Sequence, residues 1–452
     1  MTVGVDASRI ETDTRPAKAG LLRVSGWLTT VGAVGRATSL ITSPLLARAL
    51  GPSGRGELAA IIVPLTLIPW LLDLGLPSYA SRTAARGRPL GSLVGTLGTG
   101  GLVLGLGGMA LAFPLAQLFG RGRHVVEVYI LIGLLLLPVA MISNILVGLL
   151  VGLERWTRIY VVQLILPVMT LLGTVTLYVT GRLSVDTAAA TFLVAASLTG
   201  IPLLALIRDA RPLRVDRLIA REGLSFGIKA WLGSLASITN LRLDQLLMIF
   251  LVTQKQLGLY VVAVNMAGMV SLLTGGVSTA VIPRAARDDP HVTARALRAT
   301  VAVLLVGGVG LAVVTPWFVP AFFGASFRAA VPIIWILIAS EVVSQARGVL
   351  NSGLVAAGRA GAGAAAELVA LFITVPGLLL LLRPFAAEGA ATVSVVAYSA
   401  SFIYLLHVAK HHFGSPLRSM LVIDHREARE LVRSGAAQLK SYSARVTSRS
   451  VR

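Results

Sequence analysis

Two arginines stand inside long apolar stretches of the sequence, where a charged side chain is costly. Arg36 lies near the middle of the stretch 24–47, and Arg242 lies inside the stretch 224–251. An arginine presents a planar fork of donors that can hold a phosphate or a carboxylate through paired hydrogen bonds. Because ionisable groups within membrane-spanning helices face a partner or an aqueous cavity, we interpret both arginines as ligands for an anion. The alternative is that each arginine pairs with a buried carboxylate.

Further polar residues accompany Arg242 in the same stretch, namely Asn240, Asp244 and Gln245. On a helix, Gln245 shares a face with Arg242, and Asn240 shares a face with Asp244. Asp244 stands two residues from Arg242 and points to nearly the opposite side, so the sequence predicts that these two do not pair easily. All four residues are candidates for a ligand-binding site.

A second polar stripe runs along the apolar stretch 331–355. Its members recur at intervals of three or four residues, or stand beside those that do: Ser340, Glu341, Ser344, Gln345, Arg347, Gly348 and Asn351. A ribbon this wide should face water or other helices, so Glu341 and Arg347 are also candidate site residues. Glu367 can reach Arg347 across the short hairpin 356–363, and for that pair we favour a structural ion pair.

The sequence offers little for other kinds of chemistry. It contains no cysteine, and it lacks the Gly-rich loop ending in Lys-Ser/Thr that binds nucleotide phosphates. His407 and His411 are four residues apart at the end of an apolar stretch, but no acidic third ligand lies nearby, so anchoring at the membrane interface is the favoured interpretation. We expect no metal, no cofactor and no enzymatic activity.

The apolar stretches themselves are typical of a multi-pass membrane protein. Of the 452 residues, 55% are hydrophobic and 13% are charged, and the mean hydropathy is +0.82. A soluble protein carries about 25% charged residues, and a disordered chain is poor in hydrophobic ones. The sequence therefore predicts an all-α polytopic membrane protein of about twelve helices. The predicted spans are 24–47, 58–77, 91–118, 128–151, 159–180, 187–207, 224–251, 258–282, 299–318, 331–355, 364–382 and 389–409.

The basic residues divide unevenly between the two sides of this predicted bundle. With the N-terminus in the cytoplasm, 29 of the 40 Lys and Arg residues fall on the cytoplasmic side, counting Lys229 near the start of the span 224–251, and 8 fall on the outer side. The bias follows the positive-inside rule and predicts an even number of spans with both termini in the cytoplasm. Because the charge is scattered over short loops, we expect no nucleic-acid partner.

The two halves of the chain resemble each other. Gly56-Glu-Leu-Ala-Ala begins the second predicted span, and Gly258-Leu-Tyr-Val-Val begins the eighth. Ser81-Arg-Thr-Ala-Ala-Arg and Pro283-Arg-Ala-Ala-Arg follow those spans at the same offset of 202 residues. This pattern suggests duplication of a six-helix unit, an arrangement that transporters use around a central site. At the same offset Arg242 corresponds to a position one helical turn from Arg36, so each half would point one guanidinium at the centre of the bundle.

The predicted organisation is therefore two pseudo-symmetric six-helix lobes around a central cavity. Its parts are a cytoplasmic segment 1–23, an N-lobe 24–207, a basic cytoplasmic connection 208–223, a C-lobe 224–409 and a basic cytoplasmic tail 410–452.

Three segments carry a resemblance to a known family. They are Arg48-Ala-Leu-Gly-Pro-Ser-Gly-Arg-Gly-Glu-Leu-Ala-Ala, then Asp73-Leu-Gly-Leu-Pro-Ser-Tyr-Ala-Ser-Arg, then the Arg242/Asp244 helix followed by Gly258-Leu-Tyr. The chain resembles bacterial polysaccharide-biosynthesis membrane proteins. These are the lipid-linked oligosaccharide flippases of the multidrug/oligosaccharidyl-lipid/polysaccharide (MOP) exporter superfamily.

The resemblance implies a flippase of the bacterial cytoplasmic membrane that moves an undecaprenyl-diphosphate-linked oligosaccharide by alternating access. It also implies a cationic central cavity, to which Arg36 and Arg242 would correspond. The expected partners are the anionic lipid-linked glycan, membrane lipids, and a glycan polymerase or glycosyltransferases. The alternatives are a drug/cation antiporter of the same superfamily, a peptidoglycan-precursor flippase, and a membrane glycan polymerase or ligase. An antiporter would be expected to carry an acid in the first span, where this chain has Arg36.

Overall fold

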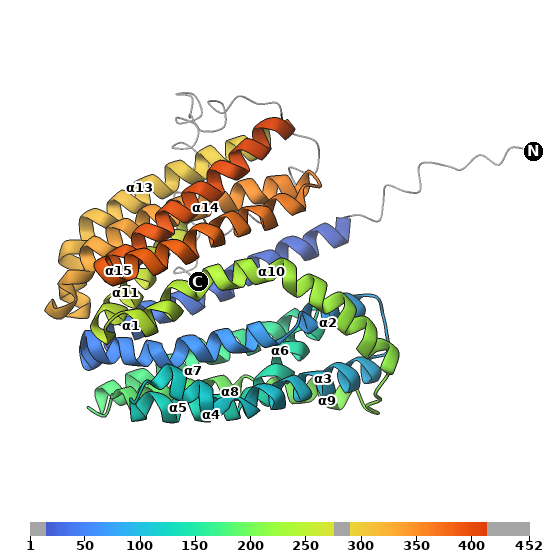
Figure 1. The fold of residues 1–452 in the computed structure, drawn as a ribbon. Coiled ribbons are helices and arrows are strands. Elements are labelled where there is room, and N and C mark those ends of the chain that lie inside the picture. The colour runs from blue at the N-terminus through green and yellow to red at the C-terminus, as the bar shows by residue number, and fades with distance from the viewer. Residues whose placement is uncertain (1–14, 275–289, 414–452) are drawn as a thin grey trace, which may run out of the picture. The chain divides into compact units, whose positions relative to one another are not determined.

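The computed structural model describes residues 15–274 and 290–413, and this part of the chain folds into helices without a β-strand (Figure 1). Nine helices precede the basic connection: α1 (Arg15–Leu72), α2 (Leu76–Ala85), α3 (Leu90–Ala110), α4 (Ala112–Gly120), α5 (His124–Leu135), α6 (Leu137–Gly152), α7 (Trp156–Val179), α8 (Val185–Leu198) and α9 (Ile201–Asp209). The remaining elements are α10 (Arg217–Leu251), α11 (Gln254–Ala267), η2 (Gly268–Leu273), α13 (Pro290–Phe323), η3 (Ala325–Ala330), α14 (Val331–Ala356) and α15 (Ala360–Phe413). The predicted all-α fold is confirmed.

Over the described residues, the predicted membrane spans lie on these helices, and the end of the predicted span 258–282 lies outside the described residues. Eight helices in this part of the chain are long and apolar enough to cross a membrane, or nine if the bent pair α5–α6 forms one span. Two long helices each cover two predicted spans, because α1 contains a non-helical residue at Gly51 and α15 contains one at Ala386. Gly51 adopts a positive φ of 65°, which glycine tolerates because it has no Cβ. The helix α10 is not among the eight, since its polar residues lower its mean hydropathy.

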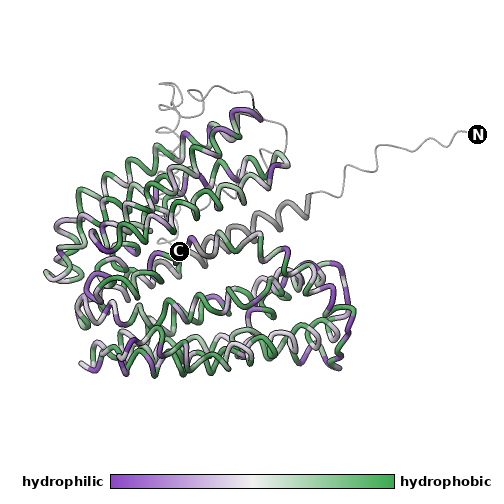
Figure 2. Tube along the Cα trace, in the orientation of Figure 1, coloured by the Kyte–Doolittle hydropathy of each residue, from purple (hydrophilic) through white to green (hydrophobic). Residues whose placement is uncertain are grey.

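Hydrophobic and hydrophilic residues are distributed along the helices as expected for membrane spans. Figure 2 shows hydrophobic residues along the helices and hydrophilic residues gathered mainly towards their ends. Many large apolar side chains stay exposed on the helix surfaces, including Val179, Val306 and Phe372. An apolar surface of this kind suits contact with lipid, and the helices satisfy their own backbone polar groups. The protein is a multi-pass membrane protein.

The chain divides into two compact units. The first contains the residues up to Asn265 together with 316–333 and 378–390, and the second contains the rest. In the first unit, buried side chains of α2, α3, α6 and α9 form an apolar core that includes Leu93 and Leu149. In the second unit, α13, α14 and α15 form a core around Leu350. The predicted lobe boundary at 208–223 remains a prediction, as does the cytoplasmic position of the segments before Arg15 and after Phe413, which lie outside the described residues.

The glycines that begin the two repeated segments face each other. A Cβ on Gly56 would overlap the carbonyl oxygen of Gln254, and a Cβ on Gly258 would overlap the carbonyl oxygen of Pro52. Pro52 and Gln254 are separated by the same 202 residues as the two glycines. The contact is therefore reciprocal, as contacts across a twofold axis are. This reciprocity supports the predicted duplication for these two segments, while the repeat that begins at Pro283 lies outside the described residues.

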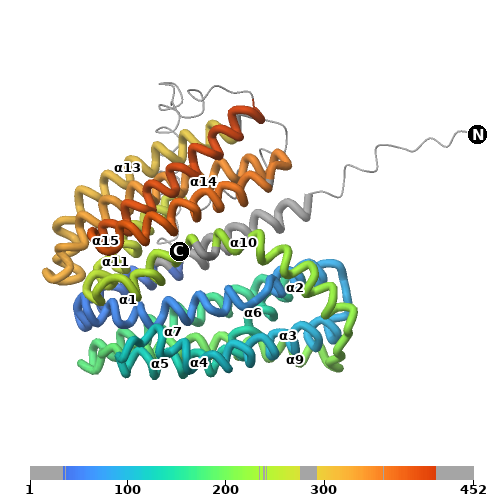
Figure 3. Tube along the Cα trace, in the orientation of Figure 1, coloured from blue at the N-terminus to red at the C-terminus, as the bar shows by residue number. Residues whose placement is uncertain are grey.

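The connection between α9 and α10 is fixed against α3. The backbone N–H of Arg214 donates to the carbonyl of Gly91 at 3.2 Å, and the N–H of Asp216 donates to the Thr96 hydroxyl at 2.8 Å. A Cβ on Gly95 would overlap the carbonyl of Arg214, so the connection runs directly over the helix backbone. Asp216 also caps α10 by accepting from the second residue of that helix at 2.8 Å. The start of α10 therefore has a defined position beside α2 and α3 (Figure 3).

Arginines in the predicted outer loops cap helix ends. Arg48 donates to the carbonyls of Ala321 and Phe322 at the end of α13. Arg121 donates to the carbonyl of Phe250 at the end of α10, at 2.5 Å. Arginine side chains stabilise helix C-termini because they satisfy carbonyls that lack intrahelical partners and face the negative end of the helix dipole. Arg48 and Arg121, which the predicted orientation places outside against the positive-inside bias, thus have a structural role.

Candidate functional site

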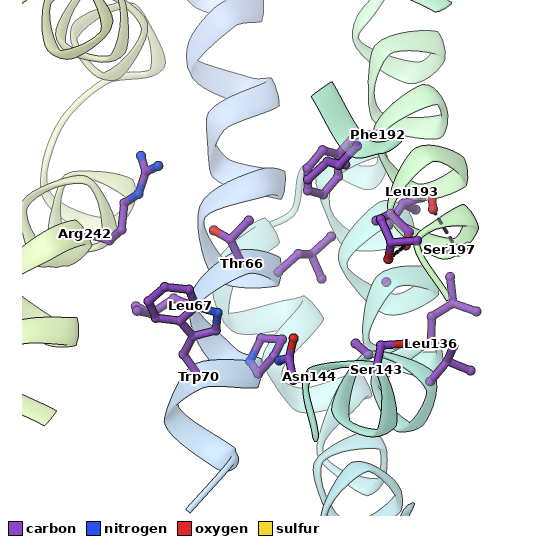
Figure 4. A pocket seen from close by; sticks show the side chains of 18 residues that line it. Thr66, Leu67, Trp70, Leu136, Ser143, Asn144, Phe192, Leu193, Ser197 and Arg242 are labelled. Carbon is purple, nitrogen blue, oxygen red and sulfur yellow. Dashed lines mark hydrogen bonds between the residues drawn. The ribbon is translucent and has the colours of Figure 1, made fainter. Parts of the chain in front are cut away.

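A cavity of about 410 Å³ lies within the first unit. It is bounded by α1, α5, α6, α7 and α8, and α10 contributes one side chain, that of Arg242 (Figure 4). The polar or aromatic side chains that line it are Thr66, Trp70, Ser143, Asn144, Phe192, Ser197, Thr199 and Arg242. Among the described residues that line the cavity, Arg242 is the one that carries a charge.

Interruptions in two predicted spans shape this cavity. The helices α5 and α6 meet at an angle of 52°, at Leu136, and Pro138 stands in the first turn of α6. A second break separates α8 from α9 at Thr199 and Gly200, and Pro202 starts α9. Proline suits the first turn of a helix because its missing N–H has no intrahelical role there. Both Leu136 and Thr199 line the cavity, so it forms where the helices change direction.

Arg242 presents an exposed side chain to this cavity. Its Nη1 donates to Oε1 of Gln245 at 3.1 Å, as predicted for two residues on one helix face. Asp244 accepts hydrogen bonds from the Tyr260 hydroxyl and from the backbone N–H of Gln245 instead. Among the described residues, no salt bridge joins Arg242 to Asp244 or to another carboxylate. Arg242 and Asp244 thus form their hydrogen bonds with other partners, as the sequence predicted.

The hydroxyl groups of the lining are held by their own helices. Thr66 donates to the carbonyls of Ile62 and Val63 at 3.0 Å, and Ser197 donates to Leu193 at 2.9 Å. A hydroxyl that donates in this way keeps lone pairs with which it can accept a hydrogen bond. Trp70 is 46% exposed and offers a flat apolar face together with an N–H donor. Neutral polar groups beside a flat ring are suited to contact sugar hydroxyls and sugar rings.

Sequence reasoning missed most of this lining. Thr66, Trp70, Ser143 and Ser197 are neutral residues of kinds that are common in membrane helices, and no charge marked them. Tyr260 was also missed as a partner of Asp244, although it stands two residues after the repeated Gly258. Its side chain is completely buried, and its hydroxyl supplies the donor that the Asp244 carboxylate needs.

The other predicted site residues have different surroundings. Asn240 and Gln245 are buried beside Arg242 on α10. The side chain of Arg36 lies outside the described part of the structure, so its role in binding an anion remains a prediction.

Glu341 and Arg347 both lie on α14, in the second unit. Gln345 donates to Glu341 at 2.8 Å. Nη1 of Arg347 lies 2.8 Å from Oε1 of Glu367, and these two side chains are only 16% and 17% exposed. The guanidinium also lies 5.2 Å from the ring centre of Tyr398. The predicted ion pair is confirmed, and its burial favours a structural role for Arg347.

Long apolar helices around a cavity whose described lining carries one charge, that of Arg242, are the architecture expected of a membrane transporter. The chain belongs to the polysaccharide biosynthesis protein family, whose model matches residues 21–289. No curated protein matches in sequence.

Solved structures share the fold at low sequence identity. The lipid II flippase MurJ, in an inward closed conformation, has 15% identity and a TM-score of 0.73, with 90% of this chain and 91% of that chain covered. An inward-facing multidrug resistance MATE family transporter of the MOP superfamily has 13% identity and a TM-score of 0.68, covering 84% and 96%. A MOP superfamily transporter from Pyrococcus furiosus, described as having a binding pocket of reversed polarity, has 14% identity and a TM-score of 0.57, covering 87% and 96%. The fold is therefore that of MOP superfamily transporters.

Proposed function

We propose that the protein moves an undecaprenyl-diphosphate-linked oligosaccharide, a polysaccharide precursor, from the inner to the outer leaflet of a bacterial cytoplasmic membrane by alternating access. The observation that carries this proposal is the position of Arg242. The side chain of Arg242 is part of the lining of a cavity in the first unit, and its guanidinium donates to the neutral side chain of Gln245. A fixed cation of this kind suits a diphosphate, because arginine binds phosphate oxygens through paired, charge-assisted hydrogen bonds.

The rest of the lining suits the glycan part of such a substrate. Thr66, Ser143, Asn144 and Ser197 offer hydrogen-bonding groups, and Trp70 offers an aromatic face. A drug/cation antiporter needs a carboxylate to attract its substrate, and the described residues that line this cavity include neither Asp nor Glu. This composition favours an anionic substrate over a cationic drug.

The test is transport by purified protein in liposomes. A lipid-linked oligosaccharide with a fluorescent sugar is placed in both leaflets, and a membrane-impermeant quencher reports how fast it crosses. We expect Arg242→Ala to lose most of the transport rate and Arg242→Lys to retain part of it, because an ammonium keeps the charge but lacks the planar fork. The matched control is Arg182→Ala, which removes an exposed arginine between α7 and α8. A normal rate in Arg242→Ala would refute the proposed site.

The same assay separates the two kinds of glycan lipid. Lipid II, the peptidoglycan precursor, also carries a diphosphate, so it competes for the same cation. We expect transport of undecaprenyl-diphosphate oligosaccharides to exceed that of lipid II under matched conditions. A preference for lipid II would assign the protein to peptidoglycan synthesis, and transport of a cationic dye alone would identify a drug exporter.

The proposal includes the orientation of the chain, with both termini and the connection 208–223 in the cytoplasm. Single cysteines can be introduced without background, because the native sequence has none. A cysteine at position 215 should be shielded from an impermeant reagent in intact cells, and one at position 255 should react. The opposite pattern would invert the proposed direction of transport. We also propose that a glycan polymerase or glycosyltransferases act beside this protein.

A further inference from the structure

A second cavity, of about 570 Å³, lies between α2 and the first half of α10, within the first unit. Five of its lining residues are basic, namely Arg82, Arg86, Arg88, Arg221 and Lys229, and one is acidic, Glu222. A cavity lined predominantly by one sign of charge concentrates ions of the opposite sign.

Close helix packing fixes the walls of this cationic cavity. A Cβ on Gly75 would overlap the carbonyl of Gly227, and a Cβ on Gly223 would lie 3.3 Å from the Tyr79 ring. The two helices therefore approach closely at these glycines. The first turn of α10 is also tied to α3 through Asp216, so the basic residues of α2 and α10 face one space on a rigid support.

Glu222, the one acid among the described lining residues, already has two hydrogen-bond donors. Oε2 of Glu222 accepts from Nη2 of Arg88 at 2.8 Å and from the Tyr79 hydroxyl at 2.9 Å. These hydrogen bonds, that from Arg88 first, lower the pKa of Glu222 below its ordinary value, so the carboxylate is ionised at neutral pH and balances Arg88.

The remaining cations are left for a ligand. The guanidinium of Arg82 lies over the Phe226 ring, 4.6 Å from its centre, and is oriented by it. Among the described residues, no carboxylate forms a salt bridge with Arg82, Arg86, Arg221 or Lys229. Like charges in one cavity repel each other, and a polyvalent anion relieves that repulsion.

We propose that this cationic cavity is a docking site for the diphosphate group of the lipid-linked glycan, occupied on the cytoplasmic side before the substrate reaches Arg242. The inference rests on the proposed function and on the predicted orientation of the chain. Several cations match a diphosphate, which carries about two negative charges, better than a phospholipid headgroup with one. Lys229 and Arg242 lie on the same helix, thirteen residues apart, which is about 20 Å at 1.5 Å per residue. The helix α10 would thus carry a cation at the beginning and at the end of the path.

The first experiment measures binding of a soluble probe, citronellyl-diphosphate-N-acetylglucosamine, to the full-length purified protein. Binding is measured both in the wild-type protein and in the Arg242→Ala variant. In the variant, binding of the probe at Arg242 is removed. We expect Arg86→Gln/Arg221→Gln to weaken binding by about tenfold or more in both backgrounds, since hydrogen bonds to charged groups are among the strong ones. The matched control is Arg211→Gln/Arg217→Gln, which removes two exposed charges outside the cavity. Unchanged binding in the Arg86/Arg221 variant would overturn the proposal.

The second experiment separates a diphosphate from a phospholipid headgroup. The protein is placed in nanodiscs with and without phosphatidylglycerol, and bound phosphatidylglycerol is counted by native mass spectrometry. We expect the Arg86/Arg221 variant to lose the soluble probe with little change in bound phosphatidylglycerol. Loss of phosphatidylglycerol with unchanged probe affinity would identify a phospholipid site and refute the docking proposal.

The third experiment distinguishes this inference from the proposed function. In the liposome assay, the Arg86/Arg221 variant should transport slowly at low substrate density and approach the wild-type rate at high density, because docking affects capture rather than the later step. An unchanged rate at low density, beside an active wild type, would refute the docking site alone. A wild type that transports no lipid-linked glycan would refute the proposed function itself. Unfolding temperatures of all variants should match that of the wild type, since the replaced residues are exposed.

Discussion

Replacing Gly56 with alanine tests the reciprocal contact between the two repeated segments. The new Cβ would lie 2.7 Å from the carbonyl carbon of Gln254 and 3.0 Å from the backbone nitrogen of Gly258, and it would overlap the Gln254 oxygen. These neighbours are backbone atoms that cannot rotate away, so the helices must separate. Overpacking of this kind costs about 1–3 kcal/mol. Gly258→Ala should cost a similar amount, because its Cβ meets Pro52 and Gly56 in the same way.

The double variant gives a sharper prediction than either single change. Once the first alanine has pushed the helices apart, the second meets less resistance, so the combined cost should be smaller than the sum of the two. Gly98→Ala and Gly107→Ala are matched controls, because a Cβ at either position meets nothing within 4 Å. Alanine there should leave stability unchanged or raise it by up to about 1 kcal/mol, through its better helix propensity.

The assay is thermal unfolding of the purified protein in detergent, followed by fluorescence-detected size exclusion. A loss of about 2 kcal/mol should lower the apparent unfolding temperature by roughly 2 °C, because the shift per kcal/mol becomes smaller as the chain becomes longer. If Gly56→Ala and Gly258→Ala melt with the Gly98 and Gly107 controls, the two helices are not in backbone contact and the twofold reasoning fails. Strictly additive costs would show that the two glycines belong to separate contacts.

Three further changes test the polar contacts of the structure. Glu367→Gln should destabilise the protein by about 3–5 kcal/mol because it leaves Arg347 buried without its carboxylate partner. Replacing both residues with apolar ones should restore much of the unfolding temperature. An unaffected single variant would show that the pair is solvated. Tyr260→Phe should lower the free energy of unfolding by about 1–3 kcal/mol because the Asp244 carboxylate loses a donor. The control Tyr178→Phe, at an exposed position, should leave stability unchanged. Equal effects of the two changes would contradict the buried contact. The folded-state pKa of Glu222 is lowered below its ordinary value of 4.5. Its contribution to stability is therefore present above the ordinary pKa and is lost as the pH falls through the folded value. The difference in unfolding temperature between wild type and Glu222→Gln should be constant near neutrality and shrink on acidification, and a difference that grows in acid would contradict this sign.

The sequence was most informative where the physical signal is local. Apolar runs long enough to span a bilayer predicted the helices, because a chain in lipid must satisfy its backbone polar groups within each segment. Helical spacing correctly predicted that Arg242 meets Gln245 and does not pair with Asp244. The Arg347–Glu367 pair was predictable for a similar reason, since a short hairpin brings the two residues together.

The candidate site was predictable only in part, because a charged residue is conspicuous in an apolar stretch of sequence and a neutral one is not. Arg242 stands out in an apolar stretch since a charge in lipid demands an explanation. Thr66, Trp70 and Ser143 do not stand out, because such residues are tolerated on any face of a membrane helix. Their contribution to the cavity depends on which faces of α1 and α6 point inward.

By itself, the sequence determined the class of fold, the positions of the membrane helices and the repeat that relates Gly56 to Gly258, because hydropathy, helical period and repetition are all properties of the chain read in order. Only the tertiary structure decided which side chains share a space. Arg86 and Arg221 line one cavity although seven helices, α3 to α9, separate them along the chain. Tyr260 reaches Asp244 only because α10 and α11 fold back on each other. In a membrane protein, apolar residues cover both the lipid-facing and the buried surfaces of each helix, so the pattern of a single helix does not reveal its neighbours; packing at close glycine contacts determines them.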